Sequence, residues 1–114
     1  MVKLIACARR KHGMTHEEFS RYWRENHGPL VKSVPEFMRY VRKYVQCHIA
    51  SNSAPLGASS DYDGVAELWF DSLDDLNRAF REPRYLEIIR PDELKFVDLT
   101  NTVSFVTEEV PIYG

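Results

Sequence analysis

Cysteines, glycines and long apolar runs are all scarce in this sequence of 114 residues, which has two cysteines and five glycines. Cys7 and Cys47 lack CxxC spacing and lie in apolar segments, so we predict buried thiols, no disulfide and no metal site. No segment approaches the roughly 20 apolar residues that a membrane span needs. The short apolar segment 2–8 is followed at once by basic residues, unlike a secretory signal, so we expect a cytoplasmic protein.

Motifs for nucleotide and nucleic-acid chemistry are also missing. The formal charge is only −2 and the one basic run, residues 9–11, is short, so we expect neither nucleic acid nor a membrane as a partner. The sequence has no GxGxxG, GxxxxGK or GxSxG motif, which removes the case for dinucleotide, NTP or serine-hydrolase chemistry, and we expect no cofactor. With 44% hydrophobic and 28% charged residues, the chain is typical of one globular domain, spanning residues 1–114.

The hydrophobic pattern predicts two helices and four strands. Residues 2–8 are apolar at nearly every position, which is typical of a strand covered on both faces. Thr15 and Glu18 form a capping box at the start of a helix, which we expect Pro29 to end. Residues 39–50 alternate between apolar and polar side chains, as a half-buried strand does.

The second half of the chain repeats the order of strand and helix. A polar loop over residues 51–61 precedes a predicted strand, 63–70, and Ser72 then caps a second helix that prolines interrupt at 83 and 91. Residues 102–112 are predicted as the last strand. The order β-α-β-β-α-β indicates an α+β, ferredoxin-like fold, with a four-stranded antiparallel sheet and both helices on one face.

The predicted strands carry apolar residues on both faces, more than two helices can cover. Exposed apolar patches of that size are usually interfaces. We therefore expect a homodimer that packs sheet against sheet and encloses a cavity for a small-molecule substrate. The topology also keeps the strands of Cys7 and Cys47 apart, which further argues against a disulfide between them.

The stretch "RYWRENHGPLV" supplies the first candidate site residues. His27 is expected in the last turn of its helix, where the helix dipole favours the imidazolium form, and could transfer a proton near neutral pH. Tyr22, Trp23 and Asn26 would add donors and flat walls for a substrate. The alternatives are a histidine that only hydrogen-bonds a helix carbonyl and a tryptophan that belongs to the core.

The predicted strands supply the remaining candidates, which we expect to share one face. Glu67 lies between apolar neighbours, so it is either an acid with an altered pKa or an ion-pair partner of Lys3 or Arg42. His48, at the end of its strand, is a second candidate for proton transfer. The expected substrate-binding side chains on the strands are Tyr40, Tyr44, Gln46, Trp69 and Phe105.

Several segments resemble the EthD family of dimeric α+β barrel proteins. They include "GMTHEEFSRYWRENHGPLV", "DGVAELWFDSLDDLNRAF", "PRYLEIIRPDELKFVD" and "SFVTEE", so the similarity extends over roughly residues 2–110. The resemblance implies a protomer that dimerises through its sheet, a pocket between sheet and helices, and a functional histidine at His27. It also implies kinship with fungal polyketide-tailoring decarboxylases and dehydratases, although the loop 51–61 is longer than the family's minimal pattern.

Three functions remain open from the sequence. The first is a cofactor-independent lyase or isomerase, with His27 as acid or base, Glu67 or His48 as its counterpart, and Tyr44 and Asn26 as oxyanion donors. The second is a cofactor-free monooxygenase that uses the same pocket. The third is a binding or accessory protein without catalytic activity.

Overall fold

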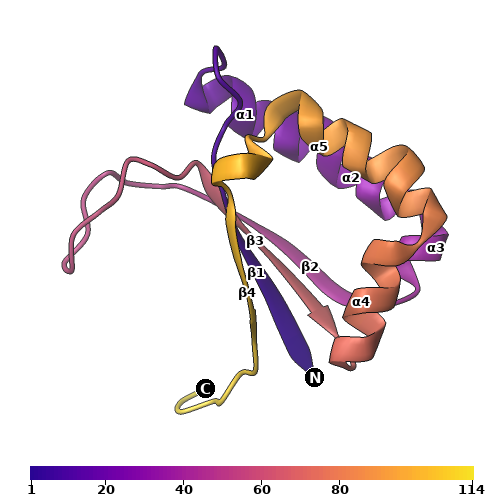
Figure 1. Ribbon diagram of the computed structural model, residues 1–114. Coiled ribbons are helices and arrows are strands. Elements are labelled where there is room, and N and C mark those ends of the chain that lie inside the picture. The colour runs from indigo at the N-terminus through magenta and orange to yellow at the C-terminus, as the bar shows by residue number, and fades with distance from the viewer.

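The computed structural model describes all residues from Met1 to Gly114 and contains a four-stranded antiparallel sheet with helices on one of its faces (Figure 1). The strands are β1 (Val2–Ala8), β2 (Val41–His48), β3 (Gly64–Phe70) and β4 (Val103–Thr107). Their order in the sheet is β2-β3-β1-β4. This topology confirms the predicted ferredoxin-like α+β fold, although β4 ends at residue 107 and not at 112.

The first helical region runs without a break through α1 (His16–Tyr22), η1 (Trp23–His27) and α2 (Gly28–Lys32). The predicted capping box begins it, because Thr15 accepts the amide of Glu18 and the Glu18 carboxylate accepts the amide of Thr15. The predicted end at Pro29 is wrong. The turn η1 is a wide, π-helical one in which the Gly28 amide donates to the Trp23 carbonyl, and this width accommodates the proline ring. A short helix, α3 (Pro35–Met38), follows.

The second helical region also contains a π-helical turn before a proline. It comprises α4 (Leu73–Arg81), η2 (Tyr85–Ile89), α5 (Arg90–Phe96) and the 3₁₀ turn η3 (Leu99–Asn101). Ser72 caps α4 by accepting the amide of Asp75, as predicted. Before Pro91, the Arg90 amide donates to the Tyr85 carbonyl across the π turn η2, so this proline also lies inside a continuous helix. None of the helices is both long and apolar enough to cross a membrane.

The core lies between the sheet and these helices and is divided into two clusters. The larger cluster includes Phe37, Leu68 and Phe70, and the smaller is formed by the buried side chains of Ala8, Phe19, Trp23 and Phe96. Strand residues contribute to the core at every second position, because successive side chains point to opposite faces of the sheet. The space between the two clusters is where the cavity described below is found.

The other face of the sheet is not covered by any helix, as Figure 1 shows. The strand registers place on it the apolar side chains of Ile5, Cys7, Val45, Cys47, Val65, Trp69, Val103 and Phe105. Of these, Phe105 keeps 52% of its surface exposed. The predicted apolar second face is therefore present. Both thiols are free and lie on non-adjacent strands, as predicted, but neither is buried, because Cys47 is exposed and Cys7 is only partly covered.

Candidate active site

A cavity of about 220 Å³ lies between the sheet and the helical layer. Its walls are mainly apolar and come from the sheet and from both helical regions; they include Leu4, Ala66, Leu68, Phe19, Phe96 and Ile89. Its polar side chains are few: His27, Tyr44, Tyr85, Arg90, Glu93, Thr102 and Ser104. The hollow thus lies inside one chain, on the helical side of the sheet. It does not lie between two sheets, as the strand pattern suggested, but where the family resemblance implied it.

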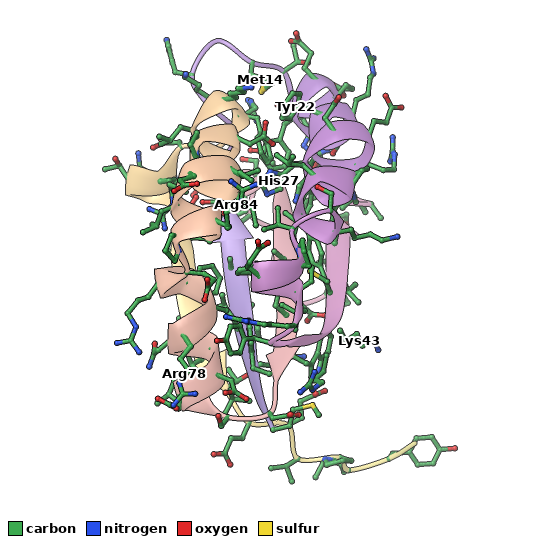
Figure 2. All side chains as sticks on the ribbon, turned by 90° about the vertical axis from the view of Figure 1, so that its right-hand side faces the viewer. Met14, Tyr22, His27, Lys43, Arg78 and Arg84 are labelled. Carbon is green, nitrogen blue, oxygen red and sulfur yellow. The ribbon has the colours of Figure 1, made fainter.

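His27 is held in the cavity wall by Asp92, across the interface between η1 and α5 (Figure 2). Its Nδ1 lies 2.7 Å from Asp92 Oδ2, and both side chains are more than nine-tenths buried. The other carboxylate oxygen accepts a hydrogen bond from the hydroxyl of Tyr22. Because an ionised carboxylate only accepts hydrogen bonds, the proton between His27 and Asp92 belongs to Nδ1, which leaves Nε2 as an acceptor.

The charge state of His27 differs from the sequence-based expectation. Burial lowers the pKa of His27 below its ordinary value, and the hydrogen bond and charge of Asp92 oppose that shift only in part. The expected imidazolium at a helix end is wrong, because the helix continues to Lys32 and His27 lies in its buried middle. The lowered pKa favours the neutral imidazole, in which Nε2 is the nitrogen without a proton.

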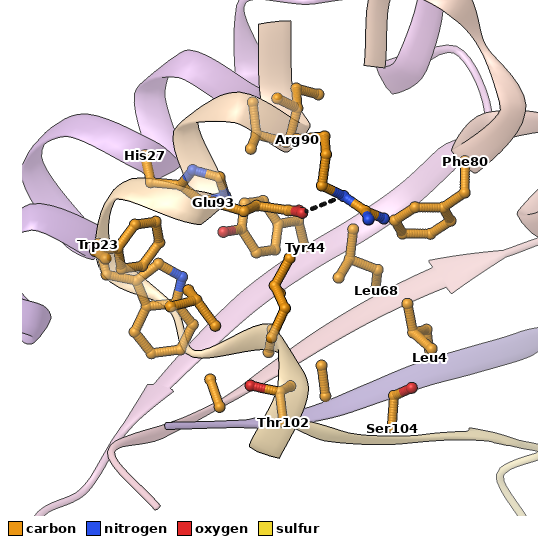
Figure 3. Close-up of a pocket in the computed structure, with 18 of the residues that line it drawn as sticks. Leu4, Trp23, His27, Tyr44, Leu68, Phe80, Arg90, Glu93, Thr102 and Ser104 are labelled. Carbon is orange, nitrogen blue, oxygen red and sulfur yellow. Dashed lines mark ion pairs between the residues drawn. The ribbon is translucent and has the colours of Figure 1, made fainter. Parts of the chain in front are cut away.

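A second polar cluster lines the same cavity and comes from η2 and α5. Glu93 Oε1 lies 2.9 Å from the hydroxyl of Tyr85 and 3.0 Å from Arg90 Nε. Figure 3 shows the Glu93 and Arg90 pair beside His27 and above Tyr44. Burial raises the pKa of Glu93, although the contacts with Tyr85 and Arg90 oppose the shift. Burial also raises the pKa of Tyr85 well above its usual range.

The predicted residues of β2 are divided between the cavity and its support. Tyr44 lines the cavity, and Gln46 donates to both the Tyr44 hydroxyl, at 3.1 Å, and the Trp23 carbonyl, at 2.9 Å. His48 contacts Gln46 and its ring centroid lies 4.7 Å from that of Trp23. Trp23 is both core and cavity wall. Gln46 and His48 therefore hold lining residues in place from behind.

Tyr22, Gln46 and His48 contact the site from outside the cavity, and five further predicted residues lie away from it. Glu67, Trp69 and Phe105 lie on the uncovered face of the sheet, because Glu67 pairs with Ile5 and Val45 and not with Tyr44. Paired residues of neighbouring strands lie on the same face of a sheet, so the expectation that Glu67 shares a face with Tyr44 is wrong. Glu67 has the alternative role that was considered, an ion pair with Lys3 at 3.4 Å.

The other two lie outside the cavity on the helical side of the sheet. Asn26 is exposed on the outer side of η1, next to His27 but rotated away from it. Tyr40 precedes β2, where it packs against the larger core cluster and beneath the guanidinium of Arg39.

Sequence reasoning missed Asp92, Glu93, Arg90 and Tyr85. The acidic pair follows Pro91, where acidic residues are common simply because they suit the first turn of a helix. A signal was nevertheless present, since positions 92 and 93 fall between the apolar residues Ile89 and Phe96 on one helical face. Carboxylates within a buried stripe need partners, and their partners here are the site residues.

The fold and the cavity together define a ferredoxin-like α+β protein with a histidine–aspartate pair in an internal apolar pocket. Residues 11–100 match the family model described as the EthD domain. The chain is also 33% identical over 117 residues to the conidial pigment biosynthesis dehydratase EthD of Metarhizium robertsii, covering 92% of this chain and 82% of that protein. The chain belongs to the EthD family.

Two further comparisons extend this relationship. A decarboxylase of Aspergillus novofumigatus is 26% identical over 110 residues, which cover 88% of this chain and 72% of that protein. The crystal structure of an EthD family protein from Bacillus halodurans is 24% identical and superimposes with a TM-score of 0.71 over 96% of this chain and 99% of that chain. The latter similarity confirms the fold.

Proposed function

We propose that this protein is an acid–base lyase of the dehydratase or decarboxylase type. In this proposal His27 Nε2 acts as general base on a small, oxygenated and largely apolar or aromatic molecule in the cavity. The observation that carries the proposal is the buried His27–Asp92 pair, whose free nitrogen belongs to a residue of the cavity wall. Relatives named as dehydratase and decarboxylase support the same reaction class.

The chemistry follows from the properties of these groups. Elimination of water from a carbonyl compound begins when a base removes the proton next to the carbonyl group, and loss of carbon dioxide leaves a carbanion that must be protonated. A neutral imidazole can perform the first step, and its imidazolium form can perform the second. Asp92 stabilises the charge that develops on the ring during either step. The reaction requires no electron transfer, so the proposal includes no cofactor.

The cavity limits the size of the substrate. Its volume of about 220 Å³ is below the range of roughly 300–1,000 Å³ that is usual for sites of drug-sized ligands. A molecule of one or two rings fits this space better than a large polycycle. The aromatic side chains of Phe19, Trp23, Phe96 and Tyr44 in the walls favour a planar substrate.

The uncovered face of the sheet supports a homodimer. Its apolar side chains on four strands would otherwise remain in contact with water, and patches of this kind on soluble proteins mark interfaces. In this proposal, a second copy of the chain covers the face. The cavity lies on the other side of the sheet, so each protomer keeps its own site.

A base-only reaction tests the role of His27 without knowledge of the substrate. The probe is 5-nitrobenzisoxazole, a planar two-ring compound that opens to a coloured phenolate when a base removes one proton. We expect wild-type protein to accelerate this reaction and His27→Ala to lose about 10²-fold of the rate. His12→Ala, which removes an exposed histidine that does not line the cavity, is the matched control. Equal rates for wild type and His27→Ala would contradict the proposed base.

A further inference from the structure

The cluster of Tyr85, Arg90 and Glu93 contains more polar groups than packing alone requires. All three residues line the cavity, whose other walls are mostly apolar. Arg90 uses its Nε for both of its contacts within the cluster, to Tyr85 at 3.0 Å and to Glu93 at 3.0 Å. Its two amino groups form no hydrogen bond or ion pair in the protein, although the guanidinium lies over the Tyr85 ring, and 45% of the side chain is exposed. These groups are free to bind a ligand.

The position of Glu93 relative to His27 adds a functional constraint. Neighbouring residues of α5 face in two directions: Asp92 contacts His27 from behind, whereas Glu93 points into the cavity toward Arg90 (Figure 3). A single turn of α5 therefore positions both His27, through Asp92, and the carboxyl group of Glu93 at the same cavity. An elimination needs such an arrangement, because one group removes a proton while another protonates the leaving oxygen.

We propose that Glu93 and Arg90 form the oxygen-binding end of the cavity, where Arg90 holds an oxygen of the substrate and the carboxyl group of Glu93 protonates it as it leaves. This inference rests on the proposed function and names its substrate class: β-hydroxy carbonyl compounds that carry an aromatic ring. Tyr85 is a positioning residue, because its hydroxyl orients the Glu93 carboxyl group.

The step balances as follows. His27 Nε2 takes the proton from the carbon beside the carbonyl group, the electrons of that C–H bond form the C=C bond, and the C–O bond breaks. The proton of Glu93 goes to the departing hydroxyl, which leaves as water. His27 is then an imidazolium and Glu93 a carboxylate, and a proton returns from the first to the second through solvent after the product leaves. Burial raises the pKa of Glu93, the direction that a proton donor requires, although the contacts with Tyr85 and Arg90 oppose this shift.

Two leaving groups separate the role of Glu93 from that of His27. The probes are 4-hydroxy-4-phenylbutan-2-one, which must lose hydroxide or water, and its acetate ester, whose leaving group needs no protonation. We expect Glu93→Gln to lose about 10²-fold on the alcohol and less than about tenfold on the ester, whereas His27→Ala loses rate on both. Glu87→Gln, a change on the exposed side of the same helix, is the control.

The outcomes distinguish the two proposals. Equal losses for Glu93→Gln on both probes, or no loss on either, would overturn the role of Glu93 while leaving the base in place. Full activity of His27→Ala on both probes would instead overturn the proposed function.

Equilibrium binding tests the same end of the cavity without turnover. We expect wild-type protein to bind 2-naphthoate about tenfold more tightly than 2-naphthalenemethanol, a difference of about 1.4 kcal/mol. Arg90→Met should abolish this preference, and Arg84→Met, which removes an exposed arginine paired with Glu87, should keep it. Equal affinities for both compounds in the wild type would refute the assignment of Arg90.

Discussion

Replacing Asp92 with asparagine tests which nitrogen of the His27 ring carries the proton. Asp92 accepts two hydrogen bonds, from His27 Nδ1 at 2.7 Å and from the hydroxyl of Tyr22. Asparagine has one acceptor oxygen and one donor amide, so it can replace only one of these contacts unchanged. The neighbouring ammonium group of Lys95, 3.7 Å from the oxygen that faces Tyr22, favours the amide oxygen on that side. The amide nitrogen then faces His27.

This orientation inverts the tautomer of the histidine. When the amide donates to Nδ1, the ring proton must sit on Nε2, and the base in the cavity is lost. We expect Asp92→Asn to reduce the rate of the benzisoxazole reaction by about 10²-fold, as much as the removal of His27 itself, because the wrong tautomer leaves no base in the cavity. Both contacts are then made by a neutral amide and no longer by a charged carboxylate, which should cost about 1–3 kcal/mol of stability, as thermal unfolding measures.

A second substitution provides the internal control. In the double variant Tyr22→Phe/Asp92→Asn, no hydroxyl holds the amide oxygen, so the amide can turn and accept from Nδ1 again. We expect the double variant to regain at least about tenfold in rate over the single one, a difference of about 1.4 kcal/mol. Nitrogen-15 NMR of the imidazole reports the tautomer directly. A proton on Nδ1 in Asp92→Asn, or no recovery in the double variant, would refute the reasoning.

The pH dependence of the wild-type rate tests the direction in which the pKa of His27 is shifted. The base must be neutral, and burial lowers the pKa of His27 below 6.5, so activity should persist down to that pH and decline at lower values. In Asp92→Asn both influences that raise this pKa are absent, so the NMR titration of the ring should move further toward acid.

Two substitutions test the walls and the outer face. A side-chain carbon at Gly64 would lie 2.4 Å from Trp23 Cζ3, so Gly64→Ala should displace the indole and cost about 1–3 kcal/mol in chemical denaturation; unchanged stability would contradict this close packing. Phe105→Glu places a charge on the uncovered sheet face and should weaken dimerisation on the order of 30-fold, as loss of a 2 kcal/mol interface contact does. Analytical ultracentrifugation measures this, with Tyr113→Glu in the exposed C-terminal tail as control. A wild type that is monomeric at all concentrations would refute the interface.

The sequence predicted the architecture well because its signals are local. The capping box at Thr15, the serine cap at Ser72 and the alternation within the strands depend on neighbouring residues, and the structure has all three. The second apolar face of the sheet could also be predicted, since counting apolar positions in strands requires no knowledge of how they pair.

The site was harder to predict because its contacts span the chain. His27 and Asp92 are 65 residues apart, and nothing near His27 indicates which carboxylate it meets. The face on which Glu67 lies depends on which residues of the two strands are paired, and the sequence pattern of each strand alone does not determine that pairing. Proline at position 29 predicted a helix end, although a wide turn can accommodate a proline ring within a helix.

These wide turns explain why two helices can line one narrow cavity over their whole length. Each helical region contributes cavity residues at every fourth position: Phe19, Trp23, His27 and Val31 in the first, and Tyr85, Ile89 and Glu93 in the second. In a regular α-helix of 3.6 residues per turn, twelve residues would rotate such a stripe by about 120° and carry its ends away from the cavity. A π turn takes up one additional residue and reduces that drift. The prolines that follow the π turns fit the turns' width, and the third residue of each stripe is a titratable one, so the two irregular turns bring His27 and Glu93 to the same space.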